Sequence, residues 1–232
     1  NEVCDYSDNK IKRIIGGYNY LYGEEITSSE EKVDNYDKNL IGNLPRAVFQ
    51  GRIEVVVSEN AAKRAVKHLM KSPVLGFDTE TRPSFKRGLK HKVSLLQIST
   101  EDTCFLFRLN RIGMPASLQE FLMSDVLKIG LSLKDDFMML RRRKDVHAEE
   151  GNWIELQDYV GRFGIEDRSL QKIYANLFGQ KISKSQRLTN WEADVLTDRQ
   201  KGYAATDAWA CIRIYKYLEE VKGMMSVVKF SV

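Results

Sequence analysis

Apolar positions change their spacing several times along this 232-residue chain, and each change predicts a separate element. Short apolar or β-branched runs bounded by turn residues are typical of strands, and a continuous run is typical of a strand buried on both faces. The predicted strands cover residues 53–57, 74–81, 93–99, 103–109 and 126–131, and a short apolar piece follows at 153–156.

Other segments repeat their apolar residues every three or four positions, which predicts helices. Ser58 and Ser169 have side chains that cap helix N-termini, Pro115 suits a first turn, and Gly179 suits a helix end. The predicted helices cover residues 59–71, 115–123, 134–143, 170–178 and 197–221.

The order of these elements predicts an α/β domain. Three adjacent strands from residue 74 onward are followed by alternating helices and a strand, which favours a mixed sheet of five to six strands flanked by helices. The strands at 93–99 and 103–109 are expected to form an antiparallel meander with the strand before them. We place the domain at residues 45–225 and interpret residues 1–44 as an irregular N-terminal arm or linker.

Composition narrows the class of protein. Hydrophobic residues make up 43% and charged residues 29%, which is ordinary for a globular chain, and no apolar run approaches the roughly 20 residues of a membrane span. Three separated cysteines, Cys4, Cys104 and Cys211, argue against a disulfide framework and predict a reducing, cytoplasmic location. Isolated histidines argue against zinc.

The buried run at 74–81 ends in two carboxylates, Asp78 and Glu80. Residues two apart point to the same face of a strand, so both side chains are aimed at one point. They repel each other and lose hydration there unless a cation lies between them, and hard divalent ions prefer such oxygen ligands. The alternative is an acidic strand end that faces solvent.

Two later segments offer further carboxylates. Tyr203 and Asp207 are four apart on an Ala-rich helix and share one face, where an unpaired Asp207 would be costly. Asp135 and Asp136 occupy the first turn of a helix after a short strand. The alternatives are an exposed Asp207 and the general preference of aspartate for helix N-termini.

In this order the three segments resemble the motifs of the DEDDy 3′–5′ exonuclease family. The matching residues are Asp78-Thr79-Glu80, the stretch 130–140 with Asp136, and Tyr203-x-x-x-Asp207. The sister DEDDh branch instead has His-x-x-x-x-Asp, and this chain has Gly202 at the histidine position. The resemblance covers about residues 50–220, and residues 154–158, 169–170 and 188–191 are also similar to family members.

The resemblance implies a ribonuclease H-like fold and a metal-dependent 3′–5′ exonuclease that uses two ions, Mg²⁺ or Mn²⁺, to hydrolyse phosphodiester bonds. It implies that Asp78 bridges both ions, that Glu80 and Asp207 hold the one that activates water, and that Asp136 acts on the other through water. Tyr203 would orient the attacking water, with general base as the rival role.

The expected partner is nucleic acid with a free 3′ end, single-stranded or frayed from a duplex. Basic and aromatic residues together are typical of single-strand binding. The candidate substrate-binding residues are Thr79, Lys86, Arg87, Lys181, Arg187 and Trp191, and Lys184 belongs to the same basic connection. For Trp191 the alternative is a core residue that braces this connection.

Three alternatives remain open. Ribonuclease D-like proteins carry helical C-terminal domains, and this chain ends soon after the third motif, so DNA is favoured over ribonuclease D-like trimming of RNA 3′ ends. A catalytically silent nucleic-acid-binding module is disfavoured because all four carboxylates and the tyrosine are present. A ribonuclease H-like endonuclease would not require the pairing of Tyr203 with Asp207.

Overall fold

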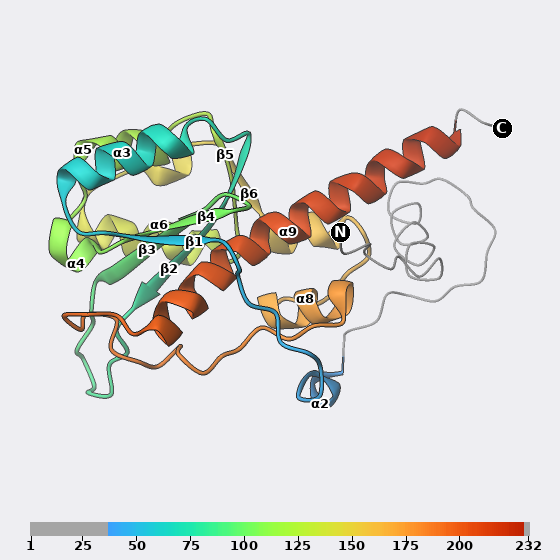
Figure 1. Ribbon diagram of the computed structural model, residues 1–232, viewed down its shortest axis with the longest axis horizontal. Helices are drawn as coiled ribbons and strands as arrows, with labels where there is room; N and C mark the ends of the chain where they lie inside the picture. The colour runs from blue at the N-terminus through green and yellow to red at the C-terminus, as the bar shows by residue number, and fades with distance from the viewer. Residues whose placement is uncertain (1–36, 230–232) are drawn as a thin grey trace.

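A mixed six-stranded sheet with helices on both faces forms the centre of the protein (Figure 1). The computed structural model describes residues 37–229, and side chains as far as residue 224. The strand order is β1-β4-β3-β2-β5-β6. The strands are β1 (Arg52–Val56), β2 (Val74–Thr81), β3 (Val93–Ser99), β4 (Thr103–Phe107), β5 (Leu127–Gly130) and β6 (Trp153–Glu155). The predicted α/β class with a mixed, helix-flanked sheet is therefore confirmed.

The predicted antiparallel meander is present as β2, β3 and β4. The outer strands are parallel to their neighbours: β1 pairs with β4, β5 with β2, and β6 with β5. β2 is thus central and covered on both faces, which is why its first half is continuously apolar. Its pairing with β3 shifts register between Glu80 and Thr81, so the regular ladder ends just beyond the two acidic residues.

The helices form two layers. α3, α5 and α6 pack on one face of the sheet, and α7, α8 and α9 pack on the other (Figure 1). The helices are α2 (Lys38–Ile41), α3 (Glu59–Leu69), α4 (Leu109–Ile112), α5 (Ala116–Leu122), α6 (Leu133–Arg143), α7 (Leu156–Gly161), α8 (Leu170–Phe178), α9 (Asp198–Lys229) and the 3₁₀ helix η1 (Ala148–Glu150). The long α9 crosses β2, β3 and β4.

The predicted helix ends are present. The Ser58 hydroxyl accepts a hydrogen bond from the Ala61 amide, and the Ser169 hydroxyl accepts one from the Lys172 amide. Gly179 ends α8 with φ of 61°, in the left-handed region that favours glycine. The helices α2, α4 and α7 and the helix η1 were not predicted, because one or two turns are too short to show a period.

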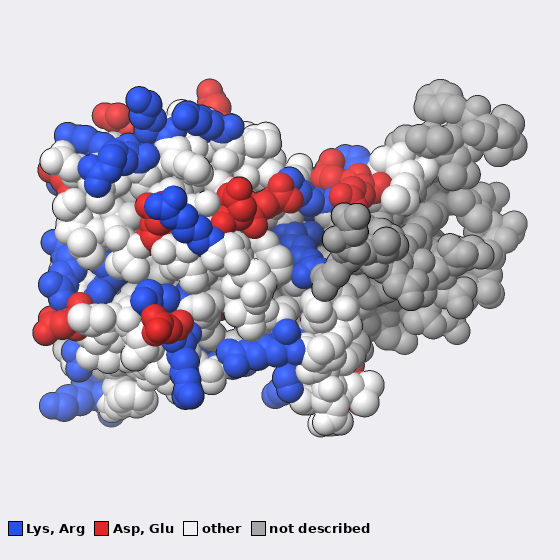
Figure 2. Space-filling view, viewed as in Figure 1, with Lys and Arg blue, Asp and Glu red and all other residues white. Residues whose placement is uncertain are grey.

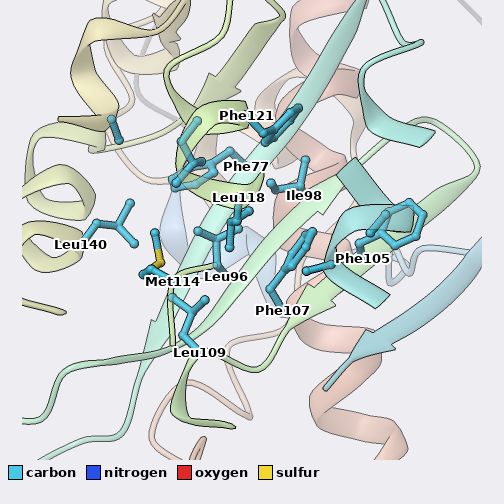
Figure 3. Packing of buried hydrophobic residues seen from close by; sticks show 14 of the residues in the cluster. Phe77, Leu96, Ile98, Phe105, Phe107, Leu109, Met114, Leu118, Phe121 and Leu140 are labelled. Atoms are coloured by element: carbon cyan, nitrogen blue, oxygen red, sulfur yellow. The ribbon is translucent and has the colours of Figure 1, made fainter. Parts of the chain in front are cut away.

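Figure 3 shows the core between the sheet and the layer of α3, α5 and α6. Phe77 of β2 lies there with Leu96 and Ile98 of β3, and Phe121 of α5 closes over them. Successive residues of a strand face opposite sides, so Asp78 and Glu80 face the other layer, toward α9. Residues 1–36 lie outside the described residues, and the division at residue 44 stays a prediction.

Candidate active site

Three of the predicted carboxylates meet where β2 lies under α9. Asp78, Glu80 and Asp207 each offer an oxygen atom within 4.8 Å of the other two. Glu80 is 8% exposed and Asp207 is 5% exposed, so two of the three are buried. The cluster joins residues more than 120 positions apart in the chain, and it exists because α9 returns across the middle of the sheet.

Burial and mutual repulsion disfavour the charged forms of these carboxylates. Loss of hydration raises the pKa of Asp78 to about 7, although the Thr79 amide opposes the shift. Loss of hydration also raises the pKa of Glu80, and the charges of Asp78, Asp207 and Asp136 raise it further. The pKa of Asp207 is raised by burial and then by Asp78. The cluster therefore resists ionisation unless positive charge enters it.

The donor set fits a hard divalent cation. Within the described part of the chain, Oδ1 of Asp207 is buried and has no hydrogen-bond partner. A buried oxygen without a partner is costly, and a cation would satisfy it. All the ligand atoms in the cluster are carboxylate oxygens, which suit Mg²⁺ or Mn²⁺ better than softer metals.

Asp136 lies beside the cluster rather than in it. It comes from the first turn of α6, and its Oδ1 accepts a hydrogen bond of 2.5 Å from the Thr79 hydroxyl. Burial raises the pKa of Asp136, and the charge of Asp78 raises it further. Thr79 points away from α9 and so links β2 to α6. Asp136 is therefore joined to β2 at Thr79, the residue between Asp78 and Glu80.

Tyr203 lies one turn before Asp207 on the same face of α9. The phenol is 7% exposed and donates a hydrogen bond to Asp207. Its pKa is raised by burial and by the charges of Asp207, Glu80 and Asp78, so the hydroxyl stays protonated and acts as a donor. Its ring packs against Trp191 with the centroids 6.0 Å apart.

Basic residues border the cluster on one side. Lys184 and Arg187 lie in the connection between α8 and α9, close enough for the charge of Lys184 to lower the pKa of Asp207 and that of Arg187 to lower the pKa of Glu80. The ammonium group of Lys181, which was also predicted to bind substrate, donates to the Gly42 carbonyl, and its predicted role stays a prediction.

The interpretation of Trp191 as a stacking residue is wrong. Its side chain is fully buried, and it packs in a cluster with Phe49, Leu95, Leu106, Leu196 and Tyr203. A ring with no exposed surface cannot stack on a nucleotide base, and the core alternative holds. Trp191 packs against the ring of Tyr203 and so supports it.

Lys86 and Arg87 are exposed on the loop between β2 and β3, and their predicted role stays a prediction.

Two carboxylates near the site were not assigned a role from the sequence. Glu155, at the end of β6, accepts hydrogen bonds from the amides of Ser132 and Leu133 at 3.0 and 2.8 Å, which fixes the start of α6. Ser132 is in the left-handed conformation with φ of 63°. Glu192 binds Arg82 and His91 at the two ends of the β2–β3 loop. These bonds join distant segments, and only the similarity of residues 154–158 to the family hinted at Glu155.

Solved structures share this architecture of a mixed sheet flanked by helices. The chain is similar to the EXO domain of Aedes aegypti Nibbler, with a TM-score of 0.69 and 22% identity over 77% of this chain and 94% of that one. It is also similar to Trypanosoma brucei RNase D in complex with RNA U12, with a TM-score of 0.62 and 19% identity over 73% of this chain and 63% of that one. At these identities the likeness shows the fold.

Sequence comparison gives the family. A family model described as 3′-5′ exonuclease matches residues 53–221. The mouse bifunctional 3′-5′ exonuclease/ATP-dependent helicase WRN is 32% identical over 206 residues, which is 82% of this chain and 14% of that protein. The chain therefore belongs to the 3′–5′ exonuclease family, as its three motifs predicted, and it spans a small part of this relative. Of the helices described, none is long and apolar enough to cross a membrane.

Proposed function

We propose that this chain removes nucleotides one at a time from the free 3′ end of a nucleic acid strand, with two divalent cations, Mg²⁺ or Mn²⁺, as cofactors. The observation that carries the proposal is the group of three carboxylates within 4.8 Å, with a buried Asp207 oxygen that has no partner among the described residues. Asp78, Glu80 and Asp207 would hold the ions, and Asp136 would complete the set from α6.

The remaining residues have separate tasks. Bound divalent ions would stabilise the attacking and leaving oxygens of the phosphodiester. Tyr203 donates a hydrogen bond and would orient the attacking water. A general-base role is disfavoured because the raised pKa of its phenol keeps the proton in place. Thr79 holds Asp136, and Lys184 and Arg187 offer positive charge to the substrate phosphates.

The proposed substrate is a single strand or a frayed duplex end. Exposed cations beside the acidic cluster support binding of a phosphate backbone. DNA is the first substrate to test, and a matched RNA strand is the alternative, because the RNase D relative was solved with RNA.

The free, buried thiols of Cys104 and Cys211 support a reducing, intracellular location, which we also propose.

Digestion of three forms of one strand would test the end dependence. A linear strand labelled at its 5′ end should shorten stepwise in Mg²⁺, whereas a circular strand and a strand with a blocked 3′ end should stay intact. Cleavage of the circle would indicate an endonuclease and contradict the proposal. Parallel DNA and RNA strands would establish the sugar preference.

Two neighbouring aspartates offer a matched pair of variants for the same assay. Asp136→Asn should abolish shortening because Asp136 is bonded to Thr79 and lies close enough to Asp78 for their charges to interact. Asp135→Asn should not, because Asp135 is exposed on the same helix turn. If both variants lost activity equally, the decrease would reflect α6 as a whole. If both kept it, Asp136 would have no part in the site.

A further inference from the structure

The loop of residues 82–92, between β2 and β3, presents apolar groups to solvent. Phe85 is 84% exposed and Leu89 is 50% exposed. Single exposed apolar residues are common on protein surfaces and need no explanation. Here the two lie four residues apart on one loop, and that loop leaves β2 two residues after Glu80. Because this loop starts so close to Glu80, its two exposed apolar side chains suggest a function.

The loop has a defined shape that keeps Phe85 outward. The Ser84 hydroxyl donates to the Lys86 carbonyl at 3.1 Å, and the Leu89 amide donates to the same carbonyl at 3.3 Å. Gly88 has φ of 83°, which allows the tight return of the chain. These local bonds build a turn with the Phe85 ring on its outer side.

Both ends of the loop are fixed by one carboxylate. Glu192 binds the Arg82 guanidinium at 3.2 Å and lies 3.6 Å from the His91 ring. Glu192 belongs to the connection between α8 and α9 that also carries Lys184 and Arg187. The loop and this basic connection are therefore held together beside the acidic cluster.

Four basic residues follow Phe85 on the same loop. Lys86, Arg87, Lys90 and Lys92 are exposed, and within the described residues none of them forms an ion pair. Figure 2 shows Lys and Arg groups at the lower left of the molecule, where Figure 1 draws this loop. An exposed aromatic ring together with unpaired cations on one loop matches the bases and phosphates of a single strand.

We propose that the loop of residues 82–92 is a binding platform for single-stranded nucleic acid, on which Phe85 stacks against a base upstream of the cleaved bond. The inference rests on the proposed function, because that function brings a strand to Glu80. Phe85 is five positions after Glu80, so the chain between them spans at most about 18 Å. At 3.4 Å per stacked nucleotide, this reach corresponds to about five nucleotides from the 3′ end.

Binding of labelled single strands, measured by fluorescence anisotropy in EDTA so that no cleavage occurs, tests the platform. Phe85→Ala should weaken binding about 5- to 150-fold, the range for one stacked base, and Phe85→Trp should keep the parent affinity. Val57→Ala is the matched control, because Val57 is 56% exposed at the end of β1, and its affinity should not change. Thermal unfolding of all three variants should match the parent, since the replaced groups are exposed.

Abasic strands identify the base as the contact. A strand that lacks bases near its 3′ end should bind the parent as weakly as the normal strand binds Phe85→Ala. The affinity of Phe85→Ala should be the same for the abasic strand and the normal strand. Equal affinity of the parent and Phe85→Ala for the normal strand would show that the loop does not bind nucleic acid through Phe85. The exposed apolar groups would then indicate a protein or lipid partner.

A substrate too short to reach the loop separates this inference from the proposed function. The p-nitrophenyl ester of thymidine 5′-phosphate should be hydrolysed equally by the parent and Phe85→Ala in Mn²⁺. If the parent does not hydrolyse the ester, the proposed function fails whatever the strand-binding result. If both hydrolyse it and both bind the strand equally, the platform alone is wrong.

Discussion

Gly76 of β2 lies directly against the main chain of α9 at Ala208: a Cβ atom on Gly76 would be 1.9 Å from the Ala208 carbonyl oxygen. The strand and the helix therefore approach each other closely at this point. The contact is next to the acidic cluster, because Asp78 is two residues after Gly76 and Asp207 directly precedes Ala208. Glycine is required here by close backbone approach.

Gly76→Ala should therefore push β2 away from α9. We expect a loss of about 1–3 kcal/mol in the free energy of unfolding, as for overpacked cores, and weaker binding of divalent ions. Gly202→Ala in α9 is the matched control: its new Cβ would have no atom within 4 Å, and a helix gains up to about 1 kcal/mol from this change. Chemical denaturation measures both, and equal stability of the two variants would contradict the close-packing argument.

The raised pKa values give the metal-free protein a distinct pH dependence. A carboxyl group whose pKa rises from 3.8 to about 7 on folding, as that of Asp78 does, holds its proton in the folded state over a range where the unfolded chain has released it. The free energy of unfolding should therefore fall as the pH rises from about 4 to 7. In EDTA the melting temperature should fall across this range, and the fall should be smaller in Asp78→Asn.

Divalent ions should reverse that effect. In the proposed site these ions bind the ionised carboxylates, so Mg²⁺ or Mn²⁺ should raise the melting temperature more at pH about 8 than at pH about 5. The comparison of the parent with Asp78→Asn cancels the titration of the histidines. An equal response of both proteins to the ions at high pH would show that the ions bind elsewhere.

Tyr203→Phe should slow the chemical step while the site keeps its shape. The ring would still pack on Trp191, and only the hydroxyl that donates to Asp207 is lost. A positioned hydrogen bond of this kind is worth roughly 10²–10⁴-fold in rate, so kcat should fall by that factor with little change in KM. A variant as active as the parent between about pH 6 and 9 would reduce Tyr203 to a packing residue.

Glu155 offers a test of how Asp136 is positioned. Glu155→Ala removes both acceptors of the Ser132 and Leu133 amides and should cost about 1–3 kcal/mol of stability. It should also lower kcat, because the start of α6 carries Asp136. Glu155→Gln keeps one oxygen acceptor, so its stability and its kcat should lie between those of the parent and those of Glu155→Ala. Unchanged kcat in a folded Glu155→Ala would mean that α6 keeps its position without this carboxylate.

The sequence predicted those features that local pattern determines. The unbroken apolar run before Asp78 indicated a central strand, and the spacing of Tyr203 and Asp207 indicated one helix face. Contacts made across the fold could not be predicted, because they depend on how β2 and α9 pack. The unpartnered oxygen of Asp207, the Gly76 contact and the bonds of Glu155 belong to this group.

Trp191 shows a different limit of the sequence. A tryptophan after basic residues has the composition of a strand-binding surface, yet its burial depends on Leu95 and Leu106 in distant strands. The exposed ring of Phe85 had no periodic or motif signal either. Local composition indicated which segments border the site, and the packing decided which aromatic ring reaches solvent.

The most direct measurement is the rate at which a 5′-labelled linear strand is shortened by the parent and by Asp78→Asn, with Mg²⁺ and after its removal by EDTA. Asp78 is proposed to bind the ions, and asparagine preserves its volume while removing its charge. We expect stepwise shortening by the parent in Mg²⁺, and no shortening in EDTA or by a folded Asp78→Asn. Shortening at the parent rate in EDTA, or by Asp78→Asn, would contradict it.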